Sequence, residues 1–154
     1  MANLRRGYCE GVRVIKFPQI EEIIKSYFKD KKEIAAVFLF GSYARNKASK
    51  KSDLDLALLF ERQYQDRAFQ KRAICIVELG RLLKKDIHPV ILNTAGEELA
   101  KQIFSKGKVL ITNNPRELSL YRMIMLTKII DFSYYRGRMQ KGLIRKVMEG
   151  GTLG

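Results

Sequence analysis

The segment that decides the fold is IAAVFLFGSYARNKASKKSDLDLALLF, residues 34–60. Its first seven residues, Ile34 to Phe40, are an apolar run that predicts a buried strand. Gly41 and Ser42 follow at the point where this strand must turn. The segment ends in a second apolar run, LALLF, which predicts a second core strand. Two buried strands joined by a polar connection are therefore expected.

Asp53 and Asp55 stand at the start of the second strand, which we expect to run from Asp53 to Phe60. Residues two apart on a strand point to the same face of the sheet, so the two carboxylates converge. Like charges side by side at the end of a buried strand are costly unless a cation neutralises them. A divalent ion that prefers oxygen ligands, above all Mg²⁺, suits this pair.

Gly41 and Ser42 supply the second half of a candidate site. Glycine allows the backbone to approach a ligand closely, and Ser42 offers a hydroxyl and an N–H to a phosphate at a helix start. A phosphate cradle one strand away from a metal-binding carboxylate pair predicts a nucleoside triphosphate site. Taken singly, each piece has a plainer interpretation: an ordinary turn, and an amphipathic strand whose aspartates face water.

The combination of GS, ten residues and DxD resembles the signature of the DNA polymerase β-like nucleotidyltransferase superfamily. The short chain resembles its minimal nucleotidyltransferase branch, which includes the antitoxin partners of HEPN-domain toxins. The resemblance runs from about the first helix to the strand at Lys108–Thr112. It implies an α/β (α+β) fold with a small mixed sheet of about four strands packed by helices.

The resemblance also implies roles for residues and partners. Gly41 and Ser42 would hold the triphosphate of ATP, while Asp53 and Asp55 would act in catalysis by binding Mg²⁺, two ions in the family. The reaction would move AMP from ATP to a hydroxyl, with a tyrosine of a HEPN toxin as the expected acceptor. Two alternatives stay open: a non-catalytic binding module that neutralises a toxin or binds nucleic acid by contact, and an enzyme that modifies a small molecule of the aminoglycoside kind.

Basic residues fill the connection between the turn and the carboxylates. Arg45 follows the turn directly, and we expect it to help bind the nucleotide, because cations offset the charge of the phosphates. Lys47, Lys50 and Lys51 could do the same, although a solvated basic loop is the favoured explanation for them.

The third acidic position is where the chain departs from the family. Three-carboxylate nucleotidyltransferases carry the third on the next core strand, here expected at Asp86–Leu92. Asp86 and His88 share a face by alternation, so either is a candidate catalytic base, and the register of the branch puts His88 at the usual position. A surface Asp86 with a structural His88 is the alternative. Pro89 removes a ladder donor and predicts an edge strand or a bulge.

Length and composition indicate a single globular domain. The chain has 154 residues, of which 46% are hydrophobic and 30% charged. Thirty Lys and Arg against sixteen Asp and Glu give a net charge of +14. Such a field favours anionic partners, but a lysine-rich, possibly thermophilic, proteome is an equal explanation.

The expected location is the cytoplasm. The sequence contains no apolar segment of the ~20 residues that a bilayer span needs, and its charged N-terminal stretch does not read as a signal peptide. Cys9 and Cys75 are too few and too far apart to predict a disulfide framework or a zinc site.

The remaining elements complete one nucleotidyltransferase domain, residues 1–154, with a core at about 17–112. We expect a helix over Phe17–Lys31, a long helix over Tyr64–Leu83, a short helix over Glu97–Phe104 and a fourth strand at Val109–Ile111. The apolar side chains expected to be buried along the long helix are Phe69, Ala73, Ile76, Val77 and Leu83.

A C-terminal helical arm is predicted at about 115–149, with Pro115 at the first helical position. Its apolar residues recur at three- and four-residue steps, and we expect its first half to pack on the core. The part beyond Phe132, including Tyr134 and Tyr135, would remain available for a partner protein or a homo-oligomer.

Overall fold

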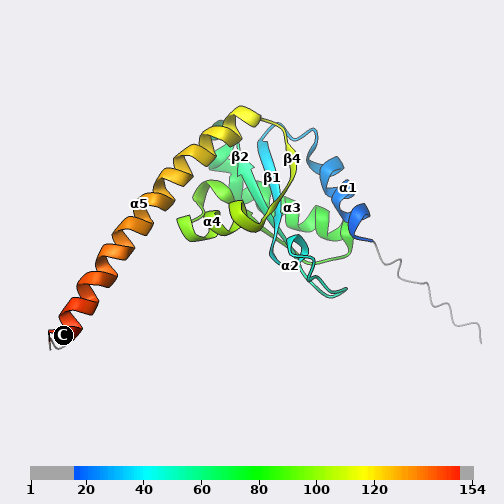
Figure 1. Cartoon of the computed structure of the whole chain (residues 1–154). Coiled ribbons are helices and arrows are strands. Elements are labelled where there is room, and N and C mark those ends of the chain that lie inside the picture. Colours follow the sequence, from blue (N-terminus) through cyan, green and yellow to red (C-terminus); the bar gives the residue numbers. More distant parts are fainter. Residues whose placement is uncertain (1–15, 150–154) are drawn as a thin grey trace, which may run out of the picture.

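The computed structural model describes residues 16–149. The helices are α1 (Phe17–Phe28), α2 (Gly41–Ala44), α3 (Ala68–Leu83), α4 (Glu97–Lys106) and α5 (Pro115–Met148), and the strands are β1 (Ile34–Phe40), β2 (Leu54–Phe60), β3 (Ile87–Ile91) and β4 (Lys108–Thr112). Two 3₁₀ helices, η1 (Arg62–Arg67) and η2 (Leu92–Thr94), follow β2 and β3 (Figure 1). Cys9 and the tail from Gly150 lie outside the described residues.

The four strands make one mixed sheet in the order β3-β2-β1-β4. β1 pairs antiparallel with β2 and β4, whereas β2 and β3 run parallel. The predicted small mixed sheet packed by helices is confirmed. Pro89 lies in β3, which is an edge strand, the position in a sheet where proline is tolerated.

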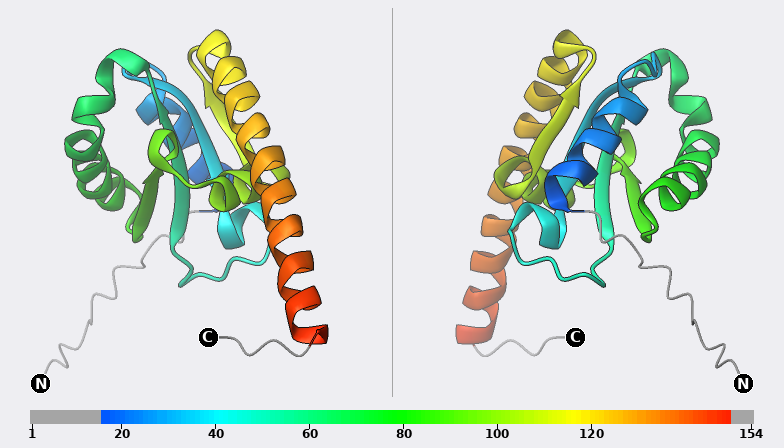
Figure 2. Two further views of the ribbon diagram at one scale, coloured as in Figure 1. Left: turned by 90° about the vertical axis from the view of Figure 1, so that its left-hand side faces the viewer. Right: turned by 90° about the vertical axis from the view of Figure 1, so that its right-hand side faces the viewer.

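Helices cover both faces of the sheet (Figure 2). α1 and α3 pack on one face, and α4 with the first part of α5 pack on the other. The strands alternate between these layers: Leu56 and Leu58 belong to the α1/α3 core, while Ala57 and Leu59 belong to the α4/α5 core. Burial on both faces explains why β1 and β2 read as continuous apolar runs.

The strand connections bring three sequence segments to one end of the sheet. β1 ends there at α2, and the polar connection returns the chain to the start of β2 (Figure 2). Because β3 is parallel to β2, it also starts at this end, with Asp55 opposite His88. The antiparallel pairing places Phe40 opposite Asp55 on the other side. The topology therefore gathers the predicted site residues.

The buried face of α3 was predicted wrongly. The residues that α3 buries are Ala68, Cys75, Leu79 and Leu83, of which only Leu83 belongs to the predicted apolar stripe. Phe69, Ile76 and Val77 are exposed, with 67% of Phe69 accessible to solvent. The helix also begins at Ala68 and not at Tyr64, because η1 precedes it. Apolar residues surround most of this helix, so their spacing alone does not decide which side faces the sheet.

α5 begins as predicted, with Pro115 at its first position. Asn114 caps it: its side-chain oxygen accepts a hydrogen bond from the N–H of Glu117 at 3.1 Å. Leu118 and Met125 are buried, but beyond this first part the helix extends away from the core (Figure 1). In the described residues, no helix combines the length and the apolar character that crossing a membrane requires.

Candidate active site

Asp53, Asp55 and His88 come together at the end of the sheet where β2 and β3 begin. The Nδ1 atom of His88 lies 3.8 Å from an Asp53 carboxylate oxygen and 3.9 Å from one of Asp55. Side chains of Asp53 and His88 are about half exposed, at 48% and 60%, and Asp55 is 30% exposed. Solvent, and hence a soluble ligand, reaches all three groups.

Gly41 supports this cluster in a way that the sequence did not reveal. Its φ of +70° lies in the left-handed region, which side-chain-bearing residues avoid. A Cβ atom placed here would stand 2.0 Å from an Asp55 carboxylate oxygen and 2.9 Å from its Cγ. The Asp55 carboxylate therefore packs directly over Gly41. The glycine makes room for the protein's own carboxylate, whereas the sequence suggested only room for a ligand.

The negative charge of the Asp55 carboxylate is only partly offset by its neighbours His88 and Arg45. Burial raises the pKa of its carboxyl group above the ordinary value, and the Asp53 carboxylate acts in the same direction. His88 and Arg45 oppose this rise. Arg45 is held at the site because its Nε donates a hydrogen bond to the carbonyl of Gly41 at 3.2 Å. A bound cation would relieve the remaining cost of the two carboxylates.

The donor set fits a divalent ion. Two partly exposed carboxylates offer hard oxygen ligands, and Mg²⁺ is commonly held by one or two carboxylates together with substrate phosphates and water. Asp53 and Asp55 are the residues that would hold it. This fit rests on the convergence of the two side chains and on the raised pKa of Asp55.

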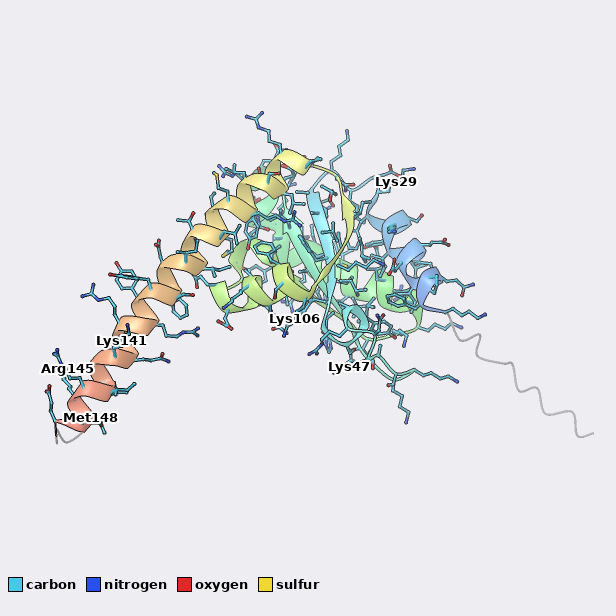
Figure 3. The ribbon with its side chains drawn as sticks, in the orientation of Figure 1. Lys29, Lys47, Lys106, Lys141, Arg145 and Met148 are labelled. Atoms are coloured by element: carbon cyan, nitrogen blue, oxygen red, sulfur yellow. The ribbon has the colours of Figure 1, made fainter. Side chains whose placement is uncertain are left out.

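Ser42 is half-buried within the short helix α2, and its carbonyl accepts a hydrogen bond from the N–H of Lys47 at 3.0 Å. This bond folds the start of the connection back on the turn. Lys47 itself is exposed and lies at the end of the molecule where α2 is found (Figure 3). Lys50 and Lys51 are exposed further along the same connection.

Asp86, the second candidate base, has a different setting. It immediately precedes β3, its side chain is exposed, and its carbonyl accepts a hydrogen bond from the N–H of Leu54 at 2.9 Å. The charged groups that act on the Asp55 carboxyl are His88, Asp53 and Arg45, and Asp86 is not one of them. The geometry thus favours His88 over Asp86 as the group nearest the carboxylate pair.

Comparison with known proteins gives a family match. Residues 22–116, which contain every candidate site residue named above, match the family described as polymerase beta, nucleotidyltransferase. A candidate protein adenylyltransferase of Methanocaldococcus jannaschii is 28% identical over 92 residues, covering 53% of this chain and 92% of that protein.

Solved structures share the fold. A toxin–antitoxin crystal structure with AMP-PNP has a chain that superimposes with a TM-score of 0.60 and 24% identity, covering 83% of this chain and 98% of that chain. A complex of tri-AMPylated HEPN toxin with MNT antitoxin from Shewanella oneidensis gives 0.57 and 22%, covering 86% and 99%. At these identities the likeness shows the fold alone.

Proposed function

The chain belongs to the polymerase beta nucleotidyltransferase family, and on that premise we propose that it transfers AMP from ATP to a hydroxyl group. The observation that carries the proposal is the convergence of Asp53 and Asp55 beside His88, with Asp55 packed over Gly41. Ser42 and Arg45 stand next to that glycine, where they would bind the phosphates.

In the proposed reaction the acceptor oxygen forms a bond to the α-phosphorus of ATP. The bond from that phosphorus to the bridging oxygen breaks, and pyrophosphate leaves. The proton of the acceptor hydroxyl goes to a ring nitrogen of His88, because an imidazole can act as a general base. Mg²⁺ held by Asp53 and Asp55 would supply positive charge to the phosphates. Arg45 would stabilise the negative charge that develops on the leaving group.

For the acceptor we propose a tyrosine of a HEPN toxin, which would make the chain an antitoxin. The fold is that of chains found in toxin–antitoxin complexes, one of which holds a tri-AMPylated HEPN toxin. The described residues add only helices to the small sheet, so the acceptor would come from a partner protein that docks on the open end of the site.

A second candidate function is neutralisation of a partner by binding without catalysis. The observation that favours it is His88, which stands opposite Asp55 where the family pattern expects a third carboxylate. An enzyme that modifies a small molecule is the weaker alternative, because the described residues add only helices to the small sheet and so offer no separate substrate domain.

Metal-dependent binding of ATP tests the site. ATP should raise the melting temperature in Mg²⁺ and raise it much less in EDTA, because a ligand that binds only the folded state stabilises it by mass action. Replacing both carboxylates (Asp53→Asn with Asp55→Asn) should remove the difference. Asp66→Asn with Asp131→Asn is the matched control, because both are exposed aspartates elsewhere in the chain. An Mg²⁺-dependent shift that survives in the site variant would refute the metal assignment.

A further inference from the structure

A cleft of about 600 Å³ lies beside the candidate active site, between the C-terminal half of α3 and the polar connection that leads into β2. We call it the basic cleft. Its charged lining consists of five cations, Lys50, Lys51, Arg81, Lys84 and Lys85, and two acids, Asp53 and Asp86. Asp53 therefore borders both the cleft and the carboxylate cluster. The volume is in the range of small-molecule sites.

The five cations of the basic cleft are not neutralised by the fold. Among residues 16–149, none of the five takes part in an ion pair within 4.0 Å. Cations gathered in one concave surface repel each other and raise the local positive potential, which concentrates anions there. An anionic ligand would remove this cost.

Two features fix the relative position of the segments that line the cleft. Lys85 Nζ donates a hydrogen bond to the carbonyl of Lys50 at 2.8 Å, which ties the polar connection to the turn after α3. Lys84 ends α3 in a left-handed conformation, with φ of 51°. The cations thus belong to two segments that are joined across the cleft, which limits the entropy that a ligand must remove.

One wall of the basic cleft is apolar. Ile76 and Val77 line it from α3, and 51% of Val77 is exposed to solvent. These are residues that the sequence pattern assigned to the core. Exposed apolar side chains next to unpaired cations suit a ligand with both an apolar body and negative charge. Bare phosphate or pyrophosphate would leave that wall in water.

We propose that the basic cleft binds a nucleotide in addition to the ATP of the active site. The phosphates face the lysines and Arg81, and the sugar and base rest against Ile76 and Val77. The nucleotide is either free or the end of a single strand of nucleic acid, since both present the same chemistry. Binding depends on side-chain cations and needs no metal ion, unlike the binding proposed for Asp53 and Asp55.

Equilibrium dialysis in EDTA tests this, with labelled ADP as the free nucleotide and labelled tetra-adenylate as the strand. The cleft variant is Lys51→Gln with Arg81→Gln and Lys84→Gln. Its affinity for the tighter probe should fall at least tenfold, because it removes three cations that would pair with the phosphates. For tetra-adenylate, the slope of log K against log salt should flatten by about 2.

The matched control is Lys128→Gln with Lys141→Gln and Lys146→Gln, three exposed lysines on α5 with the same total charge change. Lys141 lies far along α5, away from the core (Figure 3). This control should bind both probes as the unaltered protein does. An equal loss of affinity in both triple variants would show that the effect depends only on net charge and would overturn the proposal. The absence of binding in EDTA would also overturn it.

Val77→Ser separates a nucleotide from a bare phosphate ligand. It should weaken the tighter nucleotide probe about fivefold through lost apolar contact and leave the binding of pyrophosphate unchanged. An unchanged nucleotide affinity would overturn the proposed apolar contact.

The Mg²⁺-dependent thermal shift with ATP, measured on the same variants, reports the active site separately, so failure of one proposal is distinguishable from failure of the other. Tighter binding of tetra-adenylate than of ADP identifies a strand end, and the reverse identifies a free nucleotide.

Discussion

At the scale of single residues, Gly41 and Asp55 depend on each other. A methyl group on Gly41 would overlap the Asp55 carboxylate and would also force a left-handed alanine, which costs roughly 1–2 kcal/mol. We predict that Gly41→Ala lowers AMP transfer at least 100-fold and lowers the melting temperature. Transfer assays and thermal melts measure the two effects.

Gly137→Ala is the matched control for that substitution. Nothing lies within 4 Å of the position of its Cβ, and it stands inside α5, where alanine is the better helix former. It should leave transfer unchanged and stabilise the helix by roughly 0.5–1 kcal/mol. Full ATP binding by Gly41→Ala would show that the close approach of Asp55 is not needed.

His88 and Asp86 are separated by a second pair of substitutions. If His88 takes the proton of the acceptor, His88→Ala should reduce the transfer rate by about 10²–10⁴-fold and leave ATP binding nearly intact. Asp86→Ala should have a small effect, because Asp86 is not among the groups that act on Asp55. Single-turnover transfer with saturating ATP is the measurement. Normal rates in both variants would assign the proton to solvent or to the acceptor protein.

Cys75 gives a prediction about pH. Burial raises the pKa of its thiol from 9.0 to about 12. The folded state keeps the proton that the unfolded state releases, so the associated stability is fully present below about pH 9 and is lost as the pH rises toward 12. In a Cys9→Ser background, thiol reagents at pH 8 should react slowly with the folded protein and quickly in urea. Equal rates in both states would mean that Cys75 is accessible.

At the scale of elements, the strands were the most predictable part of the fold. β1 has the predicted bounds, β2 differs from prediction by one residue at one end, and β3 and β4 differ by one residue at each end. Apolar runs bounded by polar residues define a strand that is buried on both faces, so local sequence is sufficient. The start of α5 was also predictable, because Asn114 and Pro115 are strong local signals.

The face of α3 was not predictable in the same way. Which side of a helix is buried depends on where the strand order places it, and here α3 connects β2 to the edge strand β3. Phe69 and Val77 therefore remain in solvent, although their spacing fits a buried stripe. The position of α3 in the tertiary structure, and not its own sequence, therefore determines which of its two apolar sides is buried.

The cap of α5 is an element whose contribution can be measured. Asn114 accepts the Glu117 N–H and donates to a carboxylate oxygen of Glu61 at 2.7 Å, so it joins the helix start to the end of β2. We predict that Asn114→Ala lowers the free energy of unfolding by about 1–2 kcal/mol. Urea denaturation checks this, with the exposed Ser119→Ala as the control. Identical midpoints for both variants would contradict the capping role.

At the scale of the whole molecule, the sequence could predict that Gly41, Ser42, Asp53 and Asp55 lie at one end of the sheet, because they flank a single strand connection. It left open whether Asp86 or His88 lies nearer the carboxylate pair, because that depends on the register of β3 against β2. The packing of Asp55 over Gly41 and the basic cleft could not be predicted, because each joins segments that only the tertiary structure places together.

The far part of α5 carries the last prediction, which concerns the proposed partner. Tyr134 and Tyr135 are 61% and 64% exposed on a helix that extends away from the core, and aromatic side chains of this kind often anchor protein interfaces. We expect co-expression with a neighbouring HEPN protein to give a complex in which the partner gains one or more AMP groups. Intact-mass spectrometry of the partner and co-purification are the measurements.

Three variants separate docking from chemistry in that experiment. Tyr134→Ser with Tyr135→Ser should weaken the complex, at about 2 kcal/mol per anchor, and leave the Mg²⁺-dependent ATP shift intact. Phe69→Ser with Leu82→Ser removes exposed apolar surface from α3 instead and should keep the complex. Asp53→Asn should keep the complex but abolish the mass gain, because it removes a metal-binding carboxylate and leaves the exposed tyrosines of α5 unchanged. A partner neutralised equally well by Asp53→Asn, with no AMP added in either case, would leave neutralisation by contact as the function.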